Sequence, residues 1–170
     1  MKNHILRKTI GVASLAILML AAFTQCLVFA RDKHIGYVES QAGSQVPEAI
    51  TITTHKPFGP VPGTFVTSGA FADSGILVTE SRHVSAIPSP WGVVSHFVLR
   101  FEGQDGTFWI RTQIRETVTE NELIFDQDGR WVIVDGTGAY STVHGTGDME
   151  GTADHSTNLI TRVYTGSVHF

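Results

Sequence analysis

Polar and apolar residues alternate along residues 107–117, which is the pattern of a β-strand with one buried face. One face holds Phe108, Ile110, Thr112, Ile114 and Glu116, and the other holds Trp109, Arg111, Gln113 and Arg115. Because successive side chains of a strand point to opposite faces, we expect the apolar face to point into the protein. Glu116 would then point inward as well, at the end of its strand and so near the mouth of a barrel.

Short runs of β-branched and aromatic residues recur along most of residues 48–170. Residues 93–101 and 107–117 flank a connection at 102–106 that contains Gly and Asp, which predicts a tight hairpin. In all, the pattern predicts eight strands at short, even spacing and no helix. That organisation is typical of a β-sandwich or a β-barrel.

Two further segments are predicted to interrupt the strands. The segment Asp126-Gln127-Asp128-Gly129 is rich in turn-forming residues and is expected to connect strands at 122–125 and 131–135. The segment 86–92 contains Pro88 and Pro90, so we expect a loop there.

The last predicted strand, 159–170, carries a charge on its more apolar face, which consists of Ile160, Arg162, Tyr164, Gly166, Val168 and Phe170. If this face points inward, Arg162 lies inside the protein, where a charge needs a carboxylate partner. Glu80 and Glu116 are the expected partners, although the strand at 76–82 does not show which of its faces is buried.

These polar residues are the candidates for a binding site, because a small-molecule pocket combines apolar walls with a few polar groups. We therefore predict Glu80, Glu116, Arg162 and Tyr164 as ligand-binding residues. The alternative is a structural ion pair at the end of the barrel. Tyr140, in a Gly-Ala-Tyr segment, is expected to pack over one barrel end.

The first thirty residues have the pattern of a cleavable secretory signal. Three positive residues precede an apolar stretch at 10–23, and Val28 and Ala30 stand three and one positions before the expected cut. We therefore predict three segments: a signal peptide at 1–30, a flexible spacer at 31–47 and a β-barrel domain at 48–170. The protein is expected to be secreted, to the extracellular space or the periplasm.

Two alternatives to cleavage remain. Residues 10–30 are long enough to span a bilayer as an uncleaved anchor, although Thr24 and Gln25 interrupt the apolar stretch. Lipidation of Cys26 is the other, although Phe23 and Gln25 are not the residues that a lipoprotein signal prefers. Cleavage after Ala30 would remove the only cysteine, so no disulfide is expected.

The charge of the chain argues against two classes of partner. The formal net charge is −4, and the predicted signal holds three basic residues and no acid, so the remainder carries −7. This balance argues against nucleic acid and anionic membrane surfaces. Contact with a membrane is expected only through the signal segment during export.

Three motifs that suggest a cofactor or a metal are incomplete. Gly136-Thr137-Gly138 follows a strand, but Ser141 stands where a dinucleotide fingerprint has its third glycine, and no helix follows. The segment 126–129 lacks the distal ligands of a calcium loop. The seven histidines after the signal form no short metal-binding pair. No cofactor and no metal are therefore expected.

The segments "GRWVIVDGTGAYSTVHGTGDMEGT" (129–152) and "NLITRVYTGSVHF" (158–170) resemble small exported bacterial proteins of the allene-oxide-cyclase-barrel-like group. "GTFVTSGAFADSG" and the "FVLRFEGQDGTFWIR" hairpin fit the same pattern, and plant dirigent proteins are more distant relatives. The resemblance covers about residues 48–170. It implies an all-β, antiparallel eight-stranded barrel, often a homotrimer, and no catalytic residue is carried over from it.

Three functions are consistent with such a barrel. The first is the binding of a small apolar or amphipathic molecule in the barrel cavity. The second, implied by the resemblance, is a cofactor-independent cyclase of the isomerase class that acts on an oxidised lipid or a polyketide-like chain. The third is a structural or surface-interaction protein with a filled barrel, because eight strands can enclose either packed side chains or one small ligand.

Overall fold

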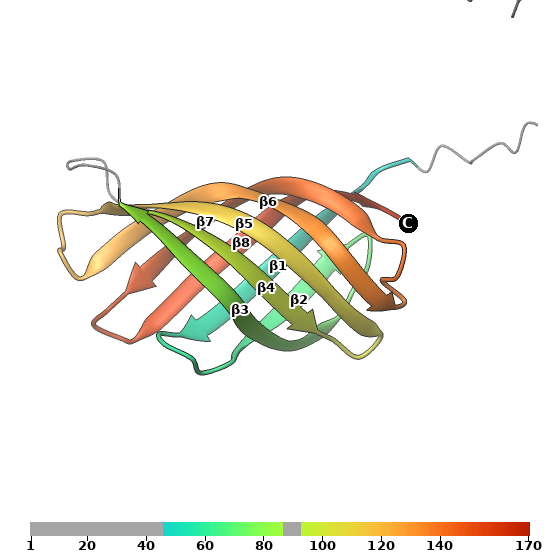
Figure 1. Cartoon of the computed structure of the whole chain (residues 1–170), viewed down its shortest axis with the longest axis horizontal. Coiled ribbons are helices and arrows are strands. Elements are labelled where there is room, and N and C mark those ends of the chain that lie inside the picture. Colours follow the sequence, from blue (N-terminus) through green and yellow to red (C-terminus); the bar gives the residue numbers. More distant parts are fainter. Residues whose placement is uncertain (1–45, 87–92) are drawn as a thin grey trace, which may run out of the picture. The chain divides into compact units, whose positions relative to one another are not determined.

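The computed structural model describes residues 46–86 and 93–170, which form a closed barrel of eight antiparallel strands (Figure 1). Each strand pairs with its neighbours in the sequence, and β1 pairs with β8 to close the sheet. The strands are β1 (Glu48–Pro57), β2 (Gly63–Gly69), β3 (Ser74–Ala86), β4 (Val93–Glu102), β5 (Gly106–Val118), β6 (Ile124–Gly138), β7 (His144–Asp154) and β8 (Leu159–His169). The prediction of an all-β fold with eight antiparallel strands is confirmed.

Some predicted features lie outside the described residues. They are the signal peptide at 1–30, the spacer up to residue 45 and the proline-containing loop at 87–92. Among the residues that are described, no helix is long and apolar enough to cross a membrane.

The inward faces follow the alternation that the sequence shows. In the β4–β5 hairpin, Leu99 lies opposite Ile110 and Phe101 opposite Phe108, and all four side chains are fully buried. On β8 the inward face includes Arg162, Tyr164 and Val168. Because one face of each strand points into the barrel, these side chains form one continuous core.

The predicted turn at 126–129 was wrong. These residues lie within β6, which pairs continuously with β5 on one side and β7 on the other. Asp126 and Asp128 are exposed on the outside, and Gln127 is buried on the inside. Two-sided pairing overrides the turn preference of Asp and Gly here, and the chain reverses instead at 119–123.

One end of the barrel is filled with aromatic side chains, and we call it the aromatic end. It carries the β2–β3, β4–β5 and β6–β7 connections (right side of Figure 1). The ring of Phe108 contacts four others, those of Phe65, Phe71, Phe101 and Tyr140. As predicted, Tyr140 packs over this end of the barrel, where its side chain is buried.

A hydrogen-bonded carboxylate fastens the aromatic end. Tyr140 Oη donates to Asp73 Oδ2 over 2.7 Å, and Asp73 Oδ1 accepts from the backbone N–H groups of Ser74 and Gln104. Burial acts to raise the pKa of Asp73, but these hydrogen bonds outweigh it and lower the pKa below its usual value. Burial and the same hydrogen bond raise the pKa of Tyr140. The polar groups at this end therefore find their partners within the fold.

The opposite end, which we call the pocket end, carries the β1–β2, β5–β6 and β7–β8 connections. The sheet is incomplete on one side of it. β2 pairs with β3 over only four residue pairs, from Gly63–Leu77 to Val66–Ser74, whereas β3 continues to Ala86 paired with β4 alone.

Candidate functional site

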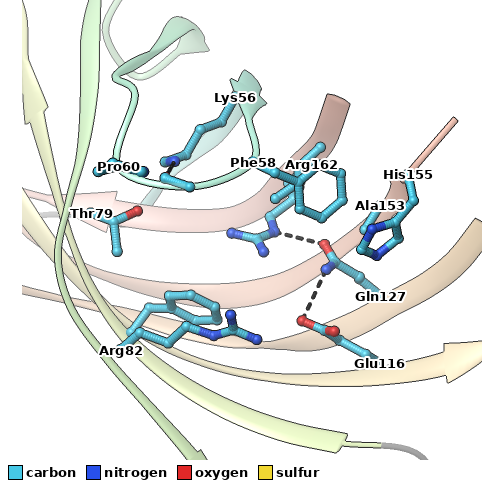
Figure 2. Close-up of a pocket in the computed structure, with 13 residues that line it drawn as sticks. Lys56, Phe58, Pro60, Thr79, Arg82, Glu116, Gln127, Ala153, His155 and Arg162 are labelled. Carbon is cyan, nitrogen blue, oxygen red and sulfur yellow. Dashed lines mark hydrogen bonds between the residues drawn. The ribbon is translucent and has the colours of Figure 1, made fainter. Parts of the chain in front are cut away.

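A pocket of about 360 Å³ opens at the pocket end. Its apolar lining comes from the β1–β2 connection and three strands, and consists of Phe58, Pro60, Phe97, Ala153 and Ile160. Its polar lining consists of Lys56, Thr79, Arg82, Glu116, Gln127, His155 and Arg162 (Figure 2). A molecule with both an apolar body and a polar group would find partners for each in this pocket.

Arg162, Gln127 and Glu116 form a chain of hydrogen bonds along one wall, drawn as dashed lines in Figure 2. Arg162 Nε donates to Gln127 Oε1 over 2.8 Å, and Gln127 Nε2 donates to Glu116 Oε1 over 3.2 Å. Because both amide atoms are engaged, the orientation of the Gln127 side chain is fixed. Arg162 is thereby linked to the Glu116 carboxylate through a neutral amide.

Sheet register explains how these three side chains meet. Glu116 pairs with Gln127, Gln127 with Gly151, and Gly151 with Arg162, so the four residues form one row across β5 to β8. A Cβ atom at Gly151 would lie 2.9 Å from Arg162 Cγ. The glycine therefore leaves the space in which Arg162 extends across β7 to reach Gln127.

Among the described residues, neither expected carboxylate pairs directly with Arg162: Glu116 is reached only through Gln127, and Glu80 pairs elsewhere. The register between β3 and β4 shifts between Thr79 and Ser81, so Glu80 is an extra residue in β3. It lies on the outside of the barrel, where its carboxylate contacts Arg100 Nε at 2.8 Å. Such a bulge reverses the alternation of the residues that follow it.

The same bulge brings Arg82 to the pocket. Beyond the register shift, Arg82 lies opposite the inward-facing Phe97. The Arg82 Cζ atom is 5.5 Å from the centre of the Phe97 ring, and the Arg162 Cζ atom is 5.0 Å from it. One aromatic ring therefore contacts two guanidinium groups, which limits the positions that they can adopt.

Lys56 adds a third positive charge to the pocket. Its residue is 6% exposed, and its Nζ atom donates to the carbonyl oxygens of Gly59, over 2.7 Å, and Pro57, over 3.1 Å. Burial lowers the pKa of Lys56, and the nearby charge of Arg162 lowers it further. These two hydrogen bonds hold the start of the β1–β2 connection beside the pocket.

Tyr164 lies on the same inward face as Arg162, but it does not line the pocket. It is fully buried, and among the described residues its Oη atom has no hydrogen-bond partner. Burial raises the pKa of Tyr164, while the charge of Arg162 acts in the opposite direction. Of the four predicted residues, the pocket therefore includes Glu116 and Arg162, with Tyr164 behind its lining and Glu80 outside the barrel.

Comparison with known proteins adds no further identification: no family model, curated protein or solved structure matches this chain. Within residues 46–86 and 93–170, no three His, Cys, Asp or Glu side chains are grouped as metal ligands.

Proposed function

We propose that this protein binds a small amphipathic molecule in the pocket at the pocket end of its barrel. The observation that supports the proposal is the pocket itself, in which buried polar groups stand beside aromatic and aliphatic walls. Pockets of about 300–1,000 Å³ at the mouths of β-barrels are common binding sites for small molecules. The 360 Å³ pocket also favours this function over that of a filled structural barrel.

We further propose that the protein acts outside the cytoplasm, in the extracellular space or the periplasm, after cleavage of residues 1–30. The n-region, the apolar stretch and the Val28–Ala30 cleavage site support this proposal. Membership of the allene-oxide-cyclase-barrel-like group and a homotrimeric state are proposals that rest on the sequence resemblance. The acidic remainder of the chain supports a function without nucleic acid.

A cofactor-independent cyclase that acts on an oxidised lipid or a polyketide-like chain is the second candidate. One observation favours it: Arg162 and Glu116, at opposite ends of Gln127, face the same partly apolar pocket. A guanidinium could polarise a carbonyl group there while a carboxylate accepts a proton. Conversion of a retained ligand by the purified protein would distinguish this candidate from binding alone.

The binding proposal is tested with the purified domain and a series of eight-carbon probes: octanol, octanoate, octyl phosphate and octyltrimethylammonium. We expect at least one probe to bind with one-to-one stoichiometry in calorimetry and to shift the amide resonances of residues around Phe97 and Ile160. Substitution of Ala153 by Leu would fill the pocket and weaken binding, whereas Val134→Leu on the outer surface would not. Failure of all four probes to bind would overturn the proposal.

A further inference from the structure

We infer that the molecule bound in this pocket carries an oxyanion, a carboxylate or a phosphate, which is held by the guanidinium groups of Arg162 and Arg82. The inference concerns the same pocket and therefore rests on the proposed binding function. It assigns the chemical class of the polar group, which the proposed function leaves open.

The distribution of basic residues is the first observation. Seven lysines and arginines occur in the described part of an acidic chain, and Lys56, Arg82 and Arg162 all line this one pocket. Among the described residues that line the pocket, Glu116 is the only one with a carboxylate. The pocket is therefore positively charged at neutral pH, opposite in sign to the chain as a whole.

The state of Arg162 is the second observation. The residue is 3% exposed, yet within 46–86 and 93–170 no carboxylate oxygen lies within 4.0 Å of its guanidinium nitrogens. By contrast, Arg100, Arg115 and Arg130 on the outer surface each have a carboxylate partner. A buried charge without a counter-ion is unfavourable, so an anion that enters the pocket would relieve a cost already present in the fold.

The orientation of Gln127 is the third observation. Its amide oxygen accepts from Arg162 Nε, and its amide nitrogen donates to Glu116. Glu116 therefore does not cap the guanidinium, and among the described residues the terminal nitrogens of Arg162 have no carboxylate partner, although the Tyr164 side chain lies near the guanidinium. We assign Gln127 as a positioning residue that holds the Nε side of Arg162 and leaves the terminal side for a ligand.

The geometry suits a planar or tetrahedral oxyanion in particular. A guanidinium presents its N–H groups in a flat fork that matches two oxygens of a carboxylate or a phosphate. Arg162 and Arg82 both lie near the ring of Phe97, so both guanidinium forks are held close to this one ring. The apolar part of the ligand would then rest against Phe58 and Ile160.

The test compares the same four eight-carbon probes by calorimetry at neutral pH. We expect octanoate or octyl phosphate to bind at least about tenfold more tightly than octanol, and octyltrimethylammonium to bind most weakly. The preference for the anion should decrease as salt is added, while octanol binding stays unchanged. The ratio of octanoate to octyl phosphate affinity distinguishes the two oxyanions. Equal binding of octanol and both anions would overturn the inference while leaving the binding function intact.

Three variants then test which residues cause the preference for an anion. Arg162→Met should lower the affinity for the better anion by about tenfold or more, and octanol affinity should change by less than about twofold. Arg82→Met, at an exposed position, should act in the same direction and covers the case in which Arg162→Met does not fold. Glu116→Gln removes the negative charge and should tighten anion binding.

The matched control is Arg130→Met, because Arg130 is an exposed arginine on the outer surface. It should leave all four affinities unchanged. Anion affinity that is unaffected by both Arg162→Met and Arg82→Met, or that falls in Glu116→Gln, would contradict the assignment of these residues.

Discussion

The two ends of this barrel bury polar groups to a similar degree but satisfy them differently. At the aromatic end Tyr140 and Asp73 are 2% and 8% exposed, and the phenol and two backbone N–H groups all donate to the Asp73 carboxylate. At the pocket end Arg162 is 3% exposed, and its partner is the neutral amide of Gln127. The two ends therefore do not differ in burial; they differ in how completely their buried polar groups are paired.

The largest expected effect is a loss of stability when an aromatic side chain of the aromatic end is removed. Phe108→Ala removes the ring that contacts Phe65, Phe71, Phe101 and Tyr140, so unfolding free energy should fall by about 3–5 kcal/mol. Urea unfolding followed by tryptophan fluorescence measures the loss. Val134→Ala, on the outer face of β6, serves as the control and should change stability by less than about 0.5 kcal/mol. Similar losses in the two variants would show that the aromatic cluster is not a core.

A smaller change in stability is expected at Tyr140, and none or a gain at Tyr164, although both tyrosines are buried. Tyr140→Phe removes the donor to Asp73 and should lower the free energy of unfolding by about 1–3 kcal/mol. Tyr164→Phe removes a buried hydroxyl that has no hydrogen-bond partner in the described part of the chain, so stability should stay constant or rise. Thermal unfolding of the two variants side by side provides the comparison. A loss on Tyr164→Phe as large as that on Tyr140→Phe would mean that both ends satisfy their polar groups equally.

Acid should reduce the stability that the Asp73 carboxylate contributes at the aromatic end. Because the folded pKa of Asp73 lies below its unfolded value of about 3.8, the unfolded chain takes up a proton first as the pH falls. The stabilisation from the Asp73 carboxylate is therefore present above that value and is lost as the pH falls toward the folded pKa. Urea midpoints measured from pH 6 to pH 2 should show a shallower acid decline for Tyr140→Phe than for the wild type. Parallel declines would contradict the assigned role of the Tyr140 hydrogen bond.

The smallest expected effect is at Glu80, on the outside of the barrel. Glu80→Gln weakens a surface ion pair with Arg100, which is worth about 0–1 kcal/mol, and should leave octanoate affinity unchanged. Calorimetry checks the affinity and thermal unfolding the stability. A clear change in octanoate affinity would mean that Glu80 acts on the pocket after all.

Much of the fold follows from side-chain alternation. The inward positions of Phe108, Ile110 and Ile114 were predicted correctly, because a strand with one buried face has a period of two. Arg162 was expected inside only if the more apolar face of the last strand pointed inward, which it does. Glu80 was misplaced because a one-residue bulge reverses that period. Arg82 is a second charged residue on the same predicted face as Glu80, and it could have indicated that the alternation changes within this strand.

Gln127 and Lys56 were missed for different reasons. Gln127 stands among Asp and Gly residues that favour turns, and only pairing on both sides of β6 keeps it in a strand. Lys56 is the last inward residue before Pro57, and its role depends on carbonyl groups of a connection whose path the sequence does not specify. Gln127 therefore acquires its position from long-range strand pairing, and Lys56 from the path of the connection that follows it; local preference encodes neither.

The most direct test of the difference between the two ends is the octanoate affinity of the wild type, Tyr140→Phe and Arg162→Met, measured by calorimetry under conditions where all three are folded. The account predicts that Tyr140→Phe, although less stable, keeps wild-type affinity within about twofold, while Arg162→Met loses about tenfold or more. Equal losses in the two variants, or a loss confined to Tyr140→Phe, would contradict the assignment of the pocket end as the binding end.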